Sequence, residues 1–160
     1  MDMHDLTIRP LGECTDLIEL TVAWHMPEFD PHGDVDFWLT ARIREAREGG
    51  VPCAWVALAG PTPVGSVSLI ENNMETHPQL TPWLAALFVL PEHRNQGIGR
   101  ALVRHCEREA STAGFATLYL FTSTARDYYA RLGWVPILEG EPYENVLVTV
   151  MKRELRIAAD

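Results

Sequence analysis

The stretch that most constrains the fold is Arg94-Asn95-Gln96-Gly97-Ile98-Gly99, because it joins an apolar run to a segment with helical spacing. The run before it, residues 84–90, predicts a buried strand, and after it apolar residues recur at positions 98, 101, 102, 106, 110 and 113. A glycine loop between a strand and a helix aims several backbone N–H groups at one point, where the helix dipole adds positive charge. Gly97 and Gly99 allow backbone angles and close approaches that a Cβ would forbid. The sequence therefore predicts a cradle for a phosphate or diphosphate.

Periodicity along the rest of the chain predicts one α/β or α+β domain over residues 1–160. The expected strands are residues 6–9, 51–58, 64–70, 83–90, 117–121, 134–138 and 146–151. The expected helices are residues 15–25, 35–48, 98–113 and 125–132, with a polar loop from residue 25 to residue 36. The element order is thus βααβββαβαββ, which predicts a mixed sheet with crossovers in the second half.

The net charge of the chain argues against some classes of binding partner. Lysine and arginine number 13 against 22 aspartate and glutamate residues, so the formal net charge is −9. An acidic surface argues against nucleic-acid binding and against a polybasic membrane anchor. No apolar run approaches the roughly 18–20 residues of a membrane span. The residues from His25 to Asp34 include two histidines and three acids without fixed ligand spacing, so no metal site is expected.

The cysteine pattern predicts reduced thiols. The chain has 3 cysteines, Cys14, Cys53 and Cys106, which are far apart and form no CxxC pair. This usage is typical of small buried residues in a cytoplasmic protein.

Two motifs at this separation resemble those of the GCN5-related N-acetyltransferase (GNAT) superfamily. The first is Leu87-Phe88-Val89 followed by the Arg94 to Gly99 loop, and the second is Ala125-x-x-Tyr128-Tyr129-x-x-x-Gly133-Trp134. The match covers residues 64–139, and residues 6–11 are similar to the family's first strand. The resemblance implies a mixed central β-sheet of six to seven strands flanked by about four helices, in agreement with the element order.

The resemblance also implies acetyl-CoA as co-substrate. Backbone amides of the loop would hold the CoA diphosphate, and the strand before the loop would pair with the pantetheine arm. Leu87 or Phe88 would polarise the thioester carbonyl through its backbone N–H. Thr122 stands where some relatives carry an asparagine, and its reach toward the pantetheine is shorter. The residues so assigned to the cofactor are Leu87, Phe88, Val89, Arg94, Asn95, Gln96, Gly97, Ile98, Gly99, Arg100, Thr122 and Tyr128.

The chemistry of amide formation requires an acid and a base. A free alkyl amine has a pKa of about 10 and must lose a proton before it attacks a thioester. The resemblance places Tyr129 at the family's general-acid position, from which it would protonate the departing thiolate. Glu71, at the end of the third strand, is the candidate base, and ordered water is the alternative.

The acceptor pocket of the family involves the region between the first two helices. There Glu28, Phe29 and Asp30 are expected to bind substrate, the two acids by attracting a cationic amine. We therefore expect an acetyl-CoA-dependent N-acetyltransferase that acts by direct attack, through a tetrahedral intermediate, on the primary amine of a small cationic molecule. A protein or peptide acceptor is the alternative within this class, and a non-catalytic CoA-binding sensor domain is the alternative outside it.

The loop lacks the Gly-Lys-Ser/Thr of a P-loop, which argues against a nucleotide-binding enzyme. The apolar strand 146–151 could pair with another copy and give a homodimer.

Overall fold

A twisted mixed sheet forms the centre of the molecule. The computed structural model describes residues 5–156, and within them seven strands run in the order β1-β2-β3-β4-β5-β7-β6. Neighbouring strands are antiparallel except for β4 and β5, which are parallel. The strands are β1 Leu6–Pro10, β2 Cys53–Ala59, β3 Thr62–Ile70, β4 Trp83–Val89, β5 Thr117–Thr122, β6 Val135–Tyr143 and β7 Val146–Glu154.

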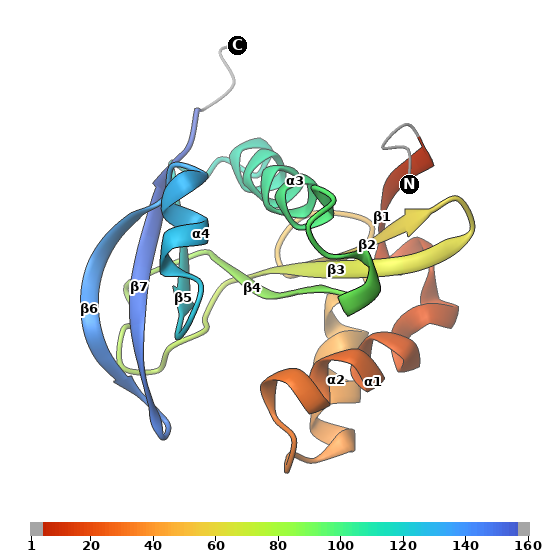
Figure 1. Ribbon diagram of the computed structural model, residues 1–160, viewed down its shortest axis with the longest axis horizontal. Coiled ribbons are helices and arrows are strands. Elements are labelled where there is room, and N and C mark those ends of the chain that lie inside the picture. The colour runs from red at the N-terminus through yellow and green to blue at the C-terminus, as the bar shows by residue number, and fades with distance from the viewer. Residues whose placement is uncertain (1–4, 157–160) are drawn as a thin grey trace.

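Helices cover both faces of the sheet. Figure 1 shows α3 on one side of β3 and β4, and the pair α1 and α2 on the other side. The helices are α1 Ile18–Phe29, α2 Val35–Glu45, α3 Ile98–Thr112 and α4 Arg126–Arg131. The side of α3 that faces the sheet is apolar, with Leu102, Val103 and Cys106 fully buried in the main core. The helices α1 and α2 instead bury the polar residues Thr21, His25 and Arg42, so the two faces differ in chemistry.

The observed element order is the predicted one, but several boundaries differ, most clearly those of α1. Residues 25–29 belong to α1, although proline and acidic residues predicted a loop there. Pro27 removes one backbone donor, but the helix continues because the buried ring of His25 packs against Phe29. The helix also begins later than predicted, because residues 15–17 form a 3₁₀ turn before Ile18.

The C-terminal strand lies inside the sheet for most of its length. The apolar residues 146–151 lie in β7, which pairs with β5 on one side and β6 on the other. On the β5 side the pairing covers residues 149–154, so residues 146–148 pair with β6 alone, and the edge of the sheet at this end is β6. A homodimer through residues 146–151 stays a prediction.

The thiols behave as the sequence predicted. Cys14, Cys53 and Cys106 are all free and buried. Burial raises the pKa of the Cys53 thiol to about 11, with Glu109 adding to the shift, so this thiol stays protonated at neutral pH.

No helix among residues 5–156 is long and apolar enough to cross a membrane. The same residues contain no group of three or more His, Cys, Asp or Glu side chains that could hold a metal ion.

Candidate active site

The strand β4 carries a bulge at its middle. Ser66 of β3 lies opposite Phe88 and Ser68 lies opposite Ala85, so two residues of β4 stand across from one of β3. Ala86 takes up the extra length with a positive φ of 52°. The bulge resets the alternation of the strand, because Leu84 and Leu87, three residues apart, both pack with the core under α3. Phe88 then faces α1.

Beyond its first residue, β4 separates from β5. The two strands share one paired position in the described chain, Trp83 opposite Tyr119, and Figure 1 shows them diverging from there. The residues after the bulge, Leu87 to Val89, therefore carry backbone N–H and C=O groups on the β5 side that no strand pairs. Such an unpaired edge can take an extended chain as an added strand.

The loop between β4 and α3 has the geometry of an anion cradle. Asn95 and Gly97 both adopt left-handed backbone angles, with φ of 62° and 87°, and they curve the amides between them toward one point. Gly97 is also the N-cap residue of α3 and supplies no side-chain hydrogen bond to the helix. Residues 94–97 are exposed, and Ala101 is the first residue of the 15-residue helix whose N–H finds a carbonyl at the turn, that of Gly97, so the N–H groups before it have no carbonyl partner within the helix.

Gly99 leaves room for a neighbour that a Cβ would crowd. A Cβ at this position would lie 3.0 Å from the hydroxyl oxygen of Tyr128 and 3.8 Å from a methyl group of Val89. The phenol of Tyr128 thus reaches from α4 to the start of α3, where the cradle lies.

Basic side chains surround this end of α3. Burial raises the pKa of Tyr128, while Arg100, Arg104 and Arg131 each act to lower it, so three guanidinium groups lie near its phenol. Arg94, one of the residues assigned to the cofactor, folds back toward β4. Its Nε donates to the carbonyl of Val89 at 2.8 Å, and its guanidinium lies 5.7 Å from the centre of the Phe88 ring.

Tyr129 is the more enclosed member of the tyrosine pair. It is 8% exposed, and its ring packs edge-on against Tyr128 and Trp134. Burial raises the pKa of Tyr129 well above its ordinary value, which keeps the phenol protonated at neutral pH.

Glu71 and Thr122 both have partners within the protein. The carboxylate of Glu71 forms an ion pair with Arg44 of α2, so it sits at the sheet end where the acceptor helices meet β3. The hydroxyl of Thr122 accepts a hydrogen bond of 2.9 Å from the backbone N–H of Ala125 and thereby fixes the entry into α4.

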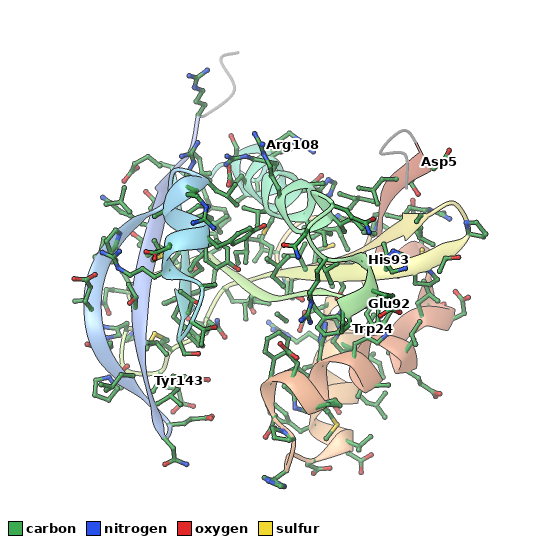
Figure 2. The ribbon with its side chains drawn as sticks, viewed as in Figure 1. Asp5, Trp24, Glu92, His93, Arg108 and Tyr143 are labelled. Atoms are coloured by element: carbon green, nitrogen blue, oxygen red, sulfur yellow. The ribbon has the colours of Figure 1, made fainter. Side chains whose placement is uncertain are left out.

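The end of α1 brings together the residues expected to meet the acceptor. Glu28 and Phe29 lie on its last turn and are exposed, with Phe29 at 43%. Asp30 accepts a hydrogen bond of 3.0 Å from the indole N–H of Trp38, which orients its carboxylate. In Figure 2, Trp24 reaches from α1 toward the turn that carries Glu92 and His93. There its ring stacks on Phe88 at 5.6 Å, joining α1 to β4.

Three acidic side chains lie near enough to Tyr143 to act on its phenol, and Figure 2 shows Tyr143 on β6 across from α1. Burial raises the pKa of Tyr143, and Glu144, Glu75 and Asp30 raise it further. The long loop that carries Glu75 is held to β6 by a contact of 2.6 Å between His77 Nε2 and a carboxylate oxygen of Glu141. The sequence analysis identified Asp30 but not Glu75 or Glu144, because nothing local indicates that the segments of Asp30 and Glu75 meet at Tyr143.

Comparison with known proteins agrees with this geometry. A model described as the acetyltransferase (GNAT) family matches residues 17–134, which include β4, the loop and both tyrosines. No curated protein matches the sequence.

Solved structures show the same fold at low sequence identity. Ard1 from Thermoplasma volcanium superposes with a TM-score of 0.72 at 17% identity, over 95% of this chain and 99% of that chain. The yncA protein of Salmonella typhimurium, solved with its cofactor acetyl-CoA, gives a TM-score of 0.67 at 19% identity, over 97% of this chain and 96% of that chain. N-acetylglutamate synthase from Neisseria gonorrhoeae, solved with coenzyme A and N-acetyl-glutamate, gives a TM-score of 0.71 at 18% identity, over 94% of this chain and 35% of that chain.

Proposed function

This chain belongs to the acetyltransferase (GNAT) family, and from that premise we propose that it moves the acetyl group of acetyl-CoA to the primary amine of a small cationic molecule. Acetyl transfer and the use of acetyl-CoA as co-substrate are properties of the family. The identity of the acceptor and the roles of individual residues are our proposal. The observation that carries it is the bulged, unpaired edge of β4 leading directly into the exposed amides of the loop.

We assign cofactor binding to backbone groups above all. The pantetheine arm would add to Leu87, Phe88 and Val89 as an extra strand, and the diphosphate would accept from the amides of residues 95–100. The space at Gly99, which a Cβ would narrow, supports this fit. Arg100 would add charge beside the phosphates, and Arg94 would join it by leaving the carbonyl of Val89.

The reacting centre needs a polarised carbonyl and a proton donor. The backbone N–H of Leu87 or Phe88 would stabilise the oxyanion of the tetrahedral intermediate in a site that excludes water. Tyr129 would give its proton to the leaving thiolate, and burial keeps that proton on the phenol at neutral pH until the thiolate forms. The amine would lose its proton to Glu71 or to ordered water, and the pairing of Glu71 with Arg44 favours water as the group in contact.

The acids at the acceptor side support a cationic substrate. Asp30 and Glu75 belong to segments far apart in the chain, yet both act on Tyr143. An ammonium group between α1 and β6 would meet this negative field before it reaches β4. Glu28 and Phe29 would line the approach.

A peptide acceptor is the alternative within the same chemistry. It is favoured by the apolar side chains that flank the same approach, since Phe29 is 43% exposed and Leu147, near the β6–β7 turn, is 65% exposed. The remaining alternative, a CoA sensor that does not turn over, predicts binding without thiol release.

The first test is a calorimetric titration with acetyl-CoA, and separately with dephospho-CoA and ATP. We expect micromolar binding of acetyl-CoA and none of ATP. A panel of diamines, monoamines, amino acids and a basic peptide then identifies the acceptor by release of free thiol and by product mass. Absence of acetyl-CoA binding would overturn the proposal, and binding without thiol release from any amine would favour the sensor.

A further inference from the structure

A layer of buried polar side chains lies between the sheet and the helices α1 and α2. Its members are no more than 1% exposed, and they are Thr21, His25, Arg42, Ser66 and Ser68. Two hydrogen bonds cross from the helices to β3. His25 Nε2 lies 2.9 Å from the hydroxyl of Ser66, and Arg42 Nη1 donates to the hydroxyl of Ser68 at 2.7 Å.

The two serines flank the bulge of β4. Ser66 is in register with Phe88 and Ser68 with Ala85, so the extra residue of β4 lies between the two tethered positions. The ring of His25 also lies 6.2 Å from that of Phe88 and packs edge-on against it. His25 therefore contacts β4 directly through Phe88 and indirectly through Ser66.

The stability of the fold does not account for this layer. His25 Nδ1 and Arg42 Nη2 are enclosed and have no partner among the described residues, which is costly for polar groups. Apolar side chains could fill the same space at lower cost, as they do under α3. Local rules of this kind are broken mainly where function requires a defined geometry.

We propose that the hydrogen bond between His25 and Ser66 is a positioning contact for acetyl transfer: it fixes the bulge of β4 so that the backbone N–H groups of Leu87 and Phe88 aim at the thioester carbonyl. The inference rests on the proposed function. His25 is fully buried and touches no reacting atom, so it acts through Ser66 and Phe88 and is a positioning residue. Its ring also packs against Phe29 and Trp38, so the same residue connects the acceptor side of the site to β4.

A direct test reads the polarisation of the carbonyl without needing the acceptor. The infrared stretch of acetyl-CoA labelled with ¹³C at the thioester carbonyl is measured free and bound. Wild-type protein is expected to lower the stretching frequency on binding, and His25→Leu and Ser66→Ala to return it toward the free value. His25→Gln, whose side-chain amide can still reach the hydroxyl of Ser66, should restore most of the shift.

A destabilising control separates positioning from mere loss of stability. Leu11→Ala opens a cavity in the 3₁₀ turn that follows β1, on the same face of the sheet and outside β3 and β4. It should lower the melting temperature and leave the carbonyl frequency of the bound acetyl-CoA as in wild type. Calorimetry with acetyl-CoA confirms that each variant is folded and binds.

Once an acceptor is identified, kinetics add a second readout. His25→Leu and Ser66→Ala should each lower kcat about tenfold to a hundredfold, with acetyl-CoA affinity nearly unchanged. The double variant should be no slower than the slower single variant, because both remove one contact. The loss of kcat should be equal at every pH.

The outcomes separate the two proposals. If wild type binds acetyl-CoA and lowers the carbonyl frequency, but the variants do so equally, the positioning role is wrong and the proposed function stands. A shifted limb in the pH profile of His25→Gln would also overturn it, since His25 would then exchange protons itself. If wild type does not bind acetyl-CoA, the proposed function fails, and the inference fails with it.

Discussion

At the scale of single residues, we expect the two adjacent tyrosines of α4 to have different roles: Tyr129 in proton transfer and Tyr128 in acetyl-CoA binding. Tyr129→Phe removes one oxygen from a ring that is otherwise held by Trp134 and Tyr128. If this phenol protonates the thiolate, kcat should fall about 10²- to 10⁴-fold, while the Kd for acetyl-CoA measured by calorimetry stays within a factor of two. Thiol release under saturating amine gives the rate.

Tyr128→Phe is the matched change on the neighbouring residue. Its hydroxyl lies at Gly99 rather than in the core, so its loss should weaken acetyl-CoA binding a few-fold. A loss of kcat confined to Tyr128→Phe would mean that Tyr128, and not Tyr129, is the proton donor. Equal losses in both variants would point to the packing of α4 instead.

The sequence motifs predicted which residues are candidates for the site, but they did not predict which partners those residues contact. The spacing from Tyr129 to Gly133 identified the candidate acid from the sequence. The return of Arg94 to the carbonyl of Val89 depends on where the loop turns after β4, and the pairing of Glu71 with Arg44 depends on how α2 docks on β3. Neither can be read from local composition.

At the scale of elements, the turn into α3 should be sensitive to any Cβ. Gly97→Ala places a side chain at φ of 87°, which is expected to cost about 1–2 kcal/mol of unfolding free energy and to distort the amides of the cradle. We expect acetyl-CoA affinity to fall at least tenfold, measured by calorimetry.

Gly114, beyond the other end of the same helix, supplies the matched control. It has a φ of 94° and nothing within 4 Å of an added Cβ, so Gly114→Ala should cost similar stability. Its acetyl-CoA affinity should equal that of wild type. Equal loss of affinity in both variants would mean that the cradle depends on α3 stability and not on the conformation of Gly97.

The contact between β3 and β4 depends on a second glycine. A Cβ on Gly65 would lie 2.7 Å from the carbonyl oxygen of Phe88 and 3.2 Å from a methyl group of Leu102. Gly65→Ala must push β4 away or shift α3, at a cost of about 1–3 kcal/mol. Chemical denaturation should show this loss. Gly49→Ala, with open space around its Cβ, should show almost none, and similar losses in both would remove the steric explanation.

Element order followed from periodicity and from glycine and proline signals, which is why all eleven helices and strands expected within the described residues were found in sequence. Boundaries failed where tertiary packing outweighed a local signal, as at Pro27 in α1. The bulge of β4 was invisible, because the residues around Ala86 are apolar on both faces and carry no alternation to interrupt. The most important geometric feature of the site was thus the one the sequence could not give.

At the scale of the whole molecule, the two faces of the sheet differ in chemistry, and we expect them to bind different substrates. The face under α3 is apolar and joins the cofactor loop to the core. The face under α1 and α2 contains the polar layer and leads to the acids around Tyr143. Since β4 is the strand that separates from its neighbour, it is the place where groups bound at opposite faces can meet. This division fits a two-substrate reaction in which each substrate enters from its own side.

The histidines make the stability of the whole fold dependent on pH. Burial, with the nearby charge of Arg108, lowers the pKa of His105 from 6.5 to about 4, although Glu109 lies 3.6 Å away. Burial and Arg42 lower the pKa of His25 in the same direction. The unfolded chain therefore binds more protons than the folded protein as pH falls below about 6.5, so the free energy of unfolding must fall there.

For His105 this loss should reach about 1–2 kcal/mol between pH 6.5 and pH 4, after a discount for its partial exposure. Melting curves followed by circular dichroism from pH 7.5 to pH 4.5 measure it, and the range above pH 5 largely avoids titration of carboxylates. His105→Gln cannot take up the proton, so its melting temperature should decline less steeply with falling pH, and His25 should contribute to the decline that remains. His32→Gln, an exposed change between α1 and α2, should keep the wild-type slope. If His105→Gln also keeps that slope, the neutral form of His105 contributes nothing to folding, and the acid sensitivity must come from the polar layer beneath β3.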